Sequence, residues 1–107
     1  MKVLMCRVGE AARVEEIDNG LESMQNVVGG YIQATYPFED EVAIICNEEG
    51  KLMGLEMNRG IPTTMDIIVG DFFICGLGED DFTDIPEELI DKYEFLMDIF
   101  MFEKEQV

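Results

Sequence analysis

The stretch Ile67-Ile68-Val69-Gly70-Asp71-Phe72-Phe73-Ile74-Cys75 is the part of the sequence on which the fold prediction depends. It is apolar on both sides of an extended chain except at Asp71, as expected for a strand that is buried on both faces. We therefore predict that residues 67–75 run through the middle of a β-sheet. Gly70 within the run predicts a bulge or a close approach of the backbone to another segment.

Shorter apolar or alternating runs on both sides of this stretch predict the remaining strands. Turn residues separate these runs: Gly9 follows the first, Pro37 ends the third, and Asn47-Glu48-Glu49-Gly50 is typical of a hairpin turn. We expect a loop over residues 56–65. The predicted strands are residues 2–8, 13–17, 31–36, 42–46, 51–55 and 67–75.

Two helices are predicted, one in each half of the chain. The first is short: Asn19 and Glu22 have the spacing of a capping box, and Gly29-Gly30 ends it. The second is longer, with Asp84 as its cap and Pro86 in its first turn. Its apolar residues keep a helical spacing as far as Phe102, the last aromatic residue of the chain. The residues predicted to pack this helix on the sheet are Leu89, Ile90, Tyr93, Leu96, Met97 and Phe100.

These elements predict one α+β domain over residues 1–107. We expect a mainly antiparallel sheet of five to six strands with one short helix and a longer C-terminal helix, in the order ββαββββα. The chain has 107 residues, of which 48% are hydrophobic. That is enough to bury a core without disulfides or metals.

The charge balance restricts the partners. The chain has 24 Asp and Glu against 7 Lys and Arg, a formal net charge of −17. Such a field repels phosphates and anionic lipids, so we expect no direct binding to nucleic acid and none to a membrane. It favours a basic protein surface as the partner. An acidic surface also keeps a small domain soluble, and this second interpretation of the charge stays open.

The cysteines and the missing histidine argue against an enzyme. Cys6, Cys46 and Cys75 lie far apart in apolar runs, which is typical of reduced, buried thiols in a cytoplasmic protein. The chain has no histidine, which removes the commonest general base and zinc ligand. The acidic run Glu79-Asp80-Asp81 lacks the alternating spacing of a calcium loop. We expect no catalytic residues, no metal and no cofactor.

The C-terminal helix has more apolar surface than one core-facing side needs. Phe95, Ile99 and Phe102 form a second stripe on another side of the helix, with acidic residues beside it. Either another part of the chain covers this stripe, or the stripe is an interface with a partner or a second copy in a homodimer. The candidate interface residues are Phe95, Ile99, Phe102, Asp91, Glu94 and Asp98.

A small-molecule site is the remaining hypothesis from the residues. Arg59 follows Asn58 in the predicted loop, and an arginine beside loop glycines can bind an anionic group with two parallel hydrogen bonds. Tyr31 and Tyr36 are the other candidate contacts for a nucleotide-like ligand. A chain of net charge −17 is an unfavourable host for an anion, and Arg59 has many local acids with which to pair.

Several short motifs, in order over roughly residues 2–78, resemble a small family of unknown function that is carried by phages and conjugative elements of Firmicutes. The motifs are Glu16-Ile17-Asp18-Asn19, Val28-Gly29-Gly30-Tyr31-Ile32, Tyr36-Pro37-Phe38, Cys46-Asn47-Glu48-Glu49-Gly50-Lys51-Leu52, Asn58-Arg59 and Ile68-Val69-Gly70-Asp71-Phe72-Phe73-Ile74. The resemblance brings no activity with it. It implies an accessory gene of a mobile element, often near antirestriction genes.

The leading hypothesis is therefore a non-enzymatic acidic interaction protein. In a counter-defence role, its carboxylates would imitate DNA phosphates and occupy the basic groove of a nucleic-acid-binding protein. The alternatives are a small-molecule or nucleotide-binding module and a structural or regulatory homodimer.

Overall fold

The computed structural model describes residues 1–103, which form an α+β fold around an antiparallel six-stranded sheet. The strand order is β2-β1-β7-β4-β3, and β8 also pairs with β7. The prediction of a mainly antiparallel sheet with a short helix and a longer C-terminal helix is confirmed. The strands of this sheet are β1 (Lys2–Cys6), β2 (Arg13–Glu16), β3 (Ile32–Thr35), β4 (Val42–Asn47), β7 (Phe72–Leu77) and β8 (Phe82–Thr83).

The second half of the apolar stretch forms the central strand, as predicted, but the first half does not. β7 lies between β1 and β4, and its residues 72–76 are buried. The chain breaks at Gly70, whose φ of 73° lies in the left-handed region that favours glycine. Residues before this turn form β6 (Asp66–Val69), which pairs with β5 (Met57–Ile61) in a separate two-stranded sheet. The predicted single strand over residues 67–75 was therefore wrong.

β5 also lies later in the chain than predicted. Residues 51–54 form turns, closed by hydrogen bonds from Met53 N–H to the Glu49 carbonyl (2.9 Å) and from Leu55 N–H to the Gly50 carbonyl (3.0 Å). These local bonds use backbone groups that a strand over residues 51–55 would need. The partner strand begins at Met57 instead, within the segment that was predicted to be a loop.

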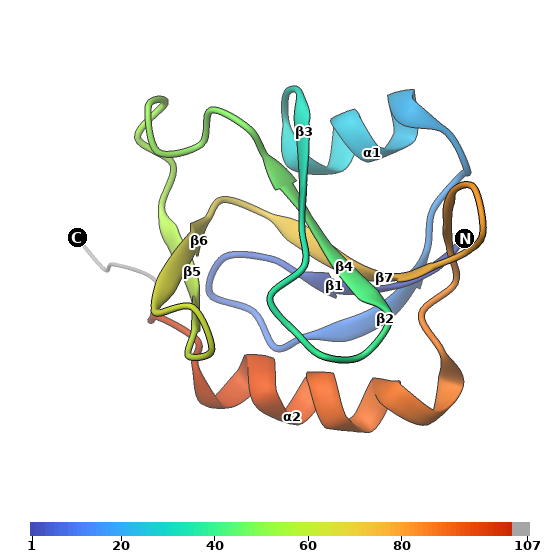
Figure 1. Cartoon of the computed structure of the whole chain (residues 1–107). Helices are drawn as coiled ribbons and strands as arrows, with labels where there is room; N and C mark the ends of the chain where they lie inside the picture. The colour runs from blue at the N-terminus through green and yellow to red at the C-terminus, as the bar shows by residue number, and fades with distance from the viewer. Residues whose placement is uncertain (104–107) are drawn as a thin grey trace.

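The helices and the small sheet cover the two faces of the main sheet. α1 (Leu21–Val28) lies on one face, and α2 (Ile90–Ile99) lies on the other, as Figure 1 shows. Alternate residues of β1, β4 and β7 therefore belong to two separate cores. The core under α1 contains Val3, Met5, Met24, Ala43, Ile45, Phe73 and Cys75. The core under α2 and the β5–β6 hairpin contains Leu4, Cys6, Ile44, Ile61, Ile68, Phe72, Ile74, Tyr93 and Met97.

Both predicted N-terminal caps are absent. α1 follows Gly20, with no capping hydrogen bond from a side chain, so Asn19 and Glu22 form no capping box. The Asp84 carboxylate accepts the N–H of Lys2 at 2.8 Å, because residues 84–85 run beside β1. A 3₁₀ turn (Glu87–Leu89) then precedes α2. The predicted end of α1 is confirmed, since Gly29 has left-handed backbone angles.

None of the helices over residues 1–103 is long and apolar enough to cross a membrane.

An ion pair near the turn that joins β1 to β2 predicts a pH effect. Arg7 donates to both carboxylate oxygens of Glu15, and Arg13 donates to one of them. The hydrogen bond from Arg7 is the main cause that lowers the pKa of Glu15 to about 2. A pKa depressed by folding contributes stability above the unfolded value, and that stability is lost on acidification.

We therefore expect Glu15→Gln to lower the free energy of unfolding at neutral pH, by less than about 1 kcal/mol because water screens a surface pair. The difference from the wild type should shrink as the pH falls from about 4.5 towards about 2. Urea unfolding at several pH values measures it. A difference that is the same at every pH would show that the ion pair does not stabilise the fold.

Candidate functional site

α2 is held on the sheet by its inner side. Tyr93 and Met97 are buried in the core, and the Tyr93 ring lies 4.7 Å from the ring of Phe38. The Tyr93 hydroxyl donates to Asp40 at 2.6 Å, and the ammonium of Lys92 donates to the same oxygen at 2.6 Å. Burial and this carboxylate raise the pKa of Tyr93 above its ordinary value. These contacts fix which side of the helix faces solvent.

The predicted inner stripe is confirmed along most of the helix. Leu89, Ile90 and Leu96 are partly buried against the same core as Tyr93. Phe100 departs from the prediction and is 38% exposed, because α2 ends at Ile99 and Phe100 no longer follows the helical spacing.

The outer side of α2 carries two exposed apolar side chains among carboxylates. Phe95 is 69% exposed and Ile99 is 55% exposed. With Asp91, Glu94 and Asp98 they line a shallow hollow of about 450 Å³. Asp91, Phe95 and Ile99 are spaced by four residues, so they lie along one side of the helix. We call these five residues the acidic–apolar face.

Phe102 does not belong to this face, although its spacing predicted that it would. Beyond α2, the chain runs beside β5: Gly60 N–H donates to the Phe100 carbonyl (2.9 Å), and Phe102 N–H donates to the Asn58 carbonyl (3.0 Å). Met101 forms a β-bridge with Arg59. Phe102 is therefore extended and partly buried instead of helical. The other five predicted interface residues lie together as expected.

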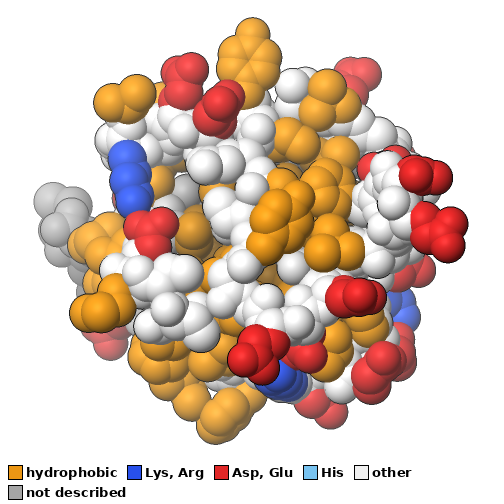
Figure 2. Space-filling model, viewed as in Figure 1, with side chains coloured by type: hydrophobic (Ala, Val, Ile, Leu, Met, Phe, Trp, Pro, Cys, Tyr) orange, Lys and Arg blue, Asp and Glu red, His pale blue; other side chains and the backbone are white. Residues whose placement is uncertain are grey.

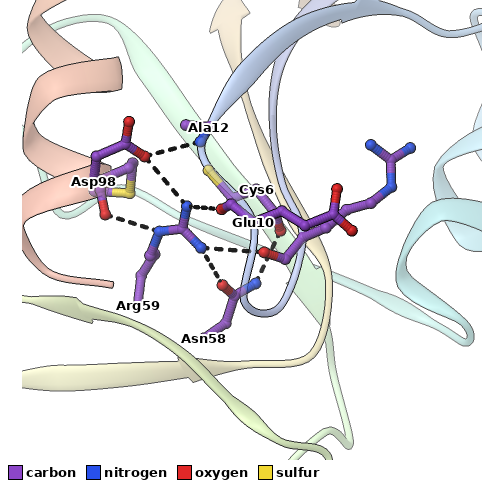
Figure 3. Close-up of polar contacts among 8 residues, drawn as sticks. Cys6, Glu10, Ala12, Asn58, Arg59 and Asp98 are labelled. Atoms are coloured by element: carbon purple, nitrogen blue, oxygen red, sulfur yellow. Dashed lines mark hydrogen bonds and ion pairs between the residues drawn. The ribbon is translucent and has the colours of Figure 1, made fainter. Parts of the chain in front are cut away.

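Asp98 connects the acidic–apolar face to the interior. Its carboxylate accepts the N–H of Ala12 at 2.8 Å and forms an ion pair with the Arg59 guanidinium at 3.4 Å (Figure 3). Asp91 and Glu94 have no basic partner among the described residues. These two carboxylates are therefore available to a cation on another protein.

Arg59 has no exposed surface and bonds to several segments at once. Its Nε donates to the Met97 carbonyl (2.8 Å) and its Nη1 to the Arg7 carbonyl (3.2 Å). Its Nη2 donates to the Glu10 carbonyl (2.6 Å), and Figure 3 labels Arg59 and Glu10. The guanidinium therefore connects β5, the turn after β1 and the end of α2. Each donor direction of the planar group is used inside the fold.

Asn58 completes this buried network. Its amide donates to the carbonyls of Cys6 (2.9 Å) and Gly70 (2.8 Å), and its oxygen accepts from Arg59 (2.5 Å). Successive strand residues normally point to opposite faces. The register of β5 shifts between Met57 and Arg59, and this bulge lets two neighbouring polar side chains both be buried.

The structure gives Asn58 and Arg59 a different role from the predicted one. Both side chains are 0% exposed and bonded within the chain, so neither offers a donor to a ligand. Tyr31 and Tyr36, by contrast, are exposed at the two ends of β3. The four candidate contacts therefore do not form one small-molecule site. No pattern in the sequence indicates this burial, because the partners of Arg59 are mainly backbone carbonyls.

The basic side chains of residues 1–103 are paired with acidic side chains of the same molecule. Every Lys and Arg within residues 1–103 forms an ion pair with a carboxylate of the same chain. Many exposed carboxylates have no basic partner within residues 1–103, among them Glu22, Glu48, Asp80 and Asp91. In Figure 2, red carboxylates accordingly outnumber blue basic groups around the rim of the view. The exposed surface of the described residues is therefore predominantly acidic.

The cysteines do not form a reactive site. Cys6, Cys46 and Cys75 are free and buried, as predicted. Burial raises the pKa of Cys6 and of Cys75 to about 12, and it raises the pKa of Cys46 as well. Neutral thiols are poor nucleophiles and metal ligands. Among residues 1–103, no group of three or more Cys, Asp or Glu residues is placed to hold a metal ion.

Comparison with known proteins finds one family. A family model described as a domain of unknown function (DUF3846) matches residues 1–98. The match extends through most of α2 and therefore beyond the motifs, which lie within residues 2–78. No curated protein matches the chain. No solved structure matches it either.

Because the hydrogen bonds of Arg59 lie within the chain, we expect its replacement to lower the stability of the fold whether or not a ligand is present. Arg59→Leu leaves three carbonyl groups and the Asn58 oxygen without their donor, so we expect the free energy of unfolding to fall by about 3 kcal/mol or more. Arg59→Lys should also destabilise, because a point charge cannot reproduce the planar fork. Urea unfolding measures both.

Arg13→Leu is the control, since that arginine is exposed and should change stability by less than about 1 kcal/mol. An Arg59→Leu protein as stable as the wild type would contradict the structural role.

Proposed function

The chain belongs to the family described as a domain of unknown function (DUF3846). That description names no activity, so we propose a function from the surface of the chain. We propose that it is a non-catalytic acidic protein that binds a basic surface of another protein through the acidic–apolar face of α2. The observation that carries the proposal is the exposure of Phe95 and Ile99 in the same hollow as the carboxylates of Asp91 and Glu94.

Apolar and acidic groups in one hollow favour a particular partner. A partner that removes Phe95 and Ile99 from water stabilises the complex by about 25 cal/mol per Å² of apolar surface buried. Asp91 and Glu94 add attraction for Lys or Arg at the rim, which raises the association rate and selects against acidic partners. The complementary surface is therefore basic, with apolar side chains at its centre.

The same charges make a second copy a poor occupant of this face. A symmetric dimer brings the same patch of two copies together. Asp91 and Glu94 of one copy would then lie near those of the other, and each copy has a formal net charge of −17. Like charges in an interface cost free energy. We therefore favour a different protein as the partner over a homodimer.

Proteins that normally bind a densely negative molecule are the class of partner that this surface favours. Proteins that bind nucleic acids have basic grooves that accept phosphates, and carboxylates can occupy such grooves. The resemblance to a family carried by phages and conjugative elements supports this choice. We propose a counter-defence role in the cytoplasm, in which the chain occupies the groove of a nucleic-acid-binding protein.

The proposal predicts which variants lose the partner. Tagged wild-type protein, Phe95→Ser/Ile99→Ser and Asp91→Asn/Glu94→Gln are used to capture proteins from a bacterial lysate at low and high salt. We expect a basic protein on the wild type that is reduced at least about tenfold on either variant, as expected for the loss of interface anchors. Raising the salt should release it, because ions screen the charges.

The matched control is Leu21→Ser/Met65→Ser, which removes two exposed apolar side chains outside α2 and should retain the partner. All of these side chains are exposed, so the variants should fold as the wild type does. A partner that is retained by both α2 variants would show that the acidic–apolar face is not the binding surface. A partner unaffected by salt would exclude imitation of phosphate.

A further inference from the structure

β3 is an edge of the main sheet that has no charged side chain to protect it. The sheet ends in β2 on one side and in β3 on the other. β2 contains Arg13, Glu15 and Glu16, and charges on an edge strand discourage pairing with other chains. β3 has the sequence Ile-Gln-Ala-Thr. In the view of Figure 1 it runs down the middle of the molecule, in front of β4.

The backbone of β3 directs hydrogen-bonding groups away from the sheet. The Tyr31 carbonyl accepts the N–H of Glu48 at 2.9 Å, and the register continues with Gln33 opposite Cys46. In an antiparallel pair, alternate residues bond to the neighbouring strand. Gln33 and Thr35 therefore bond towards β4, whereas Ile32 and Ala34 direct their N–H and C=O groups to the free edge. No described strand pairs with that edge.

A groove follows this edge on the side of the β5–β6 hairpin. It consists of two hollows, of about 240 and 270 Å³, which share Thr35, Asp66 and Ile68 in their walls. Hydrophobic side chains gather near the middle of this view of the surface in Figure 2. The exposed rings of Tyr31 (68%) and Tyr36 (60%) lie at the two ends of β3. Tyrosine is enriched at protein interfaces because it is both apolar and a hydrogen-bonding group.

The charges along the groove select a basic occupant. Glu48 and Glu49 line it, are exposed, and have no basic partner among the described residues. Lys51 also lines it, but its ammonium is paired with Asp66 at 2.7 Å. The net charge of the lining is therefore negative, which favours Lys or Arg in an incoming chain.

We propose that β3 accepts an extended, Lys- or Arg-containing segment of another protein as an additional strand. Main-chain hydrogen bonds to Ile32 and Ala34 hold the segment, and its alternate side chains enter the groove beside Thr35. The inference takes the charge of the partner from the proposed function, but it uses a different surface from α2. A second copy is disfavoured, because Glu48 and Glu49 of both chains would meet.

The test uses a short synthetic peptide of Lys alternating with Val and Thr, at up to about 1 mM, the range of weak peptide affinities. Amide hydrogen exchange is followed residue by residue by NMR. We expect the N–H groups of Ile32 and Ala34 to exchange at least about tenfold more slowly with peptide, since new hydrogen bonds protect them. The N–H groups of Gln33 and Thr35, which already bond to β4, should change little.

One modified peptide and two variants isolate the backbone pairing. A peptide N-methylated at alternate residues along the pairing edge cannot donate to β3 and should not protect Ile32 or Ala34. Ala34→Pro removes the N–H at an edge position where proline is tolerated, and it should abolish binding. Should Ala34→Pro fail to fold, the N-methylated peptide still decides the question. Ala34→Val keeps the N–H and should bind as the wild type does.

The outcome is separate from that of the α2 experiment. Protection of Ile32 and Ala34 in the Phe95→Ser/Ile99→Ser background supports the β3 site without any contribution from α2. No protection at β3, or equal binding of the N-methylated peptide, overturns the β3 proposal and leaves the α2 proposal standing. Failure of the α2 variants to lose the lysate partner overturns that proposal instead.

Discussion

The arrangement of the other elements depends on the hydrogen bonds of the buried Arg59 guanidinium. A charge with no exposed surface is costly unless hydrogen bonds replace its water. Here the replacement comes from the turn after β1, from Asn58 on β5 and from Met97 and Asp98 on α2. These segments are distant in sequence, so the hydrogen bonds of one side chain determine how they pack against one another.

This central contact also explains why the outer side of α2 is exposed. Tyr93 and Met97 face the core, and the Met97 carbonyl bonds to Arg59. The rotation of the helix is thereby set, and Phe95 and Ile99 can only face solvent. Asp98 stands between the two environments, with one oxygen bonded to Arg59 and Ala12. The surface proposed to bind a partner is therefore held rigidly by contacts in the interior.

The distribution of charge gives both proposed surfaces the same preference. The basic side chains of the described residues are paired within the chain, so the surplus carboxylates act on the surroundings without local neutralisation. On α2 they surround two apolar side chains, and along β3 they line a groove beside unpaired backbone groups. A basic partner can therefore meet either a helix face or a strand edge, which are two different modes of recognition.

The sequence by itself determined the features that depend on local pattern. Alternation and apolar runs predicted β1, β2, β3, β4 and β7 of the main sheet but not β8, and Gly29 predicted the end of α1. The helical spacing of Phe95 and Ile99 predicted a second apolar stripe on α2, and the structure shows that this stripe is exposed. Only the tertiary structure decided the separation of β6 from β7 and the burial of Arg59. Both depend on partners far away in the sequence: β6 pairs with β5, and Arg59 bonds to carbonyls whose residue types carry no signal. A local pattern cannot specify such contacts, because they exist only once the elements have packed.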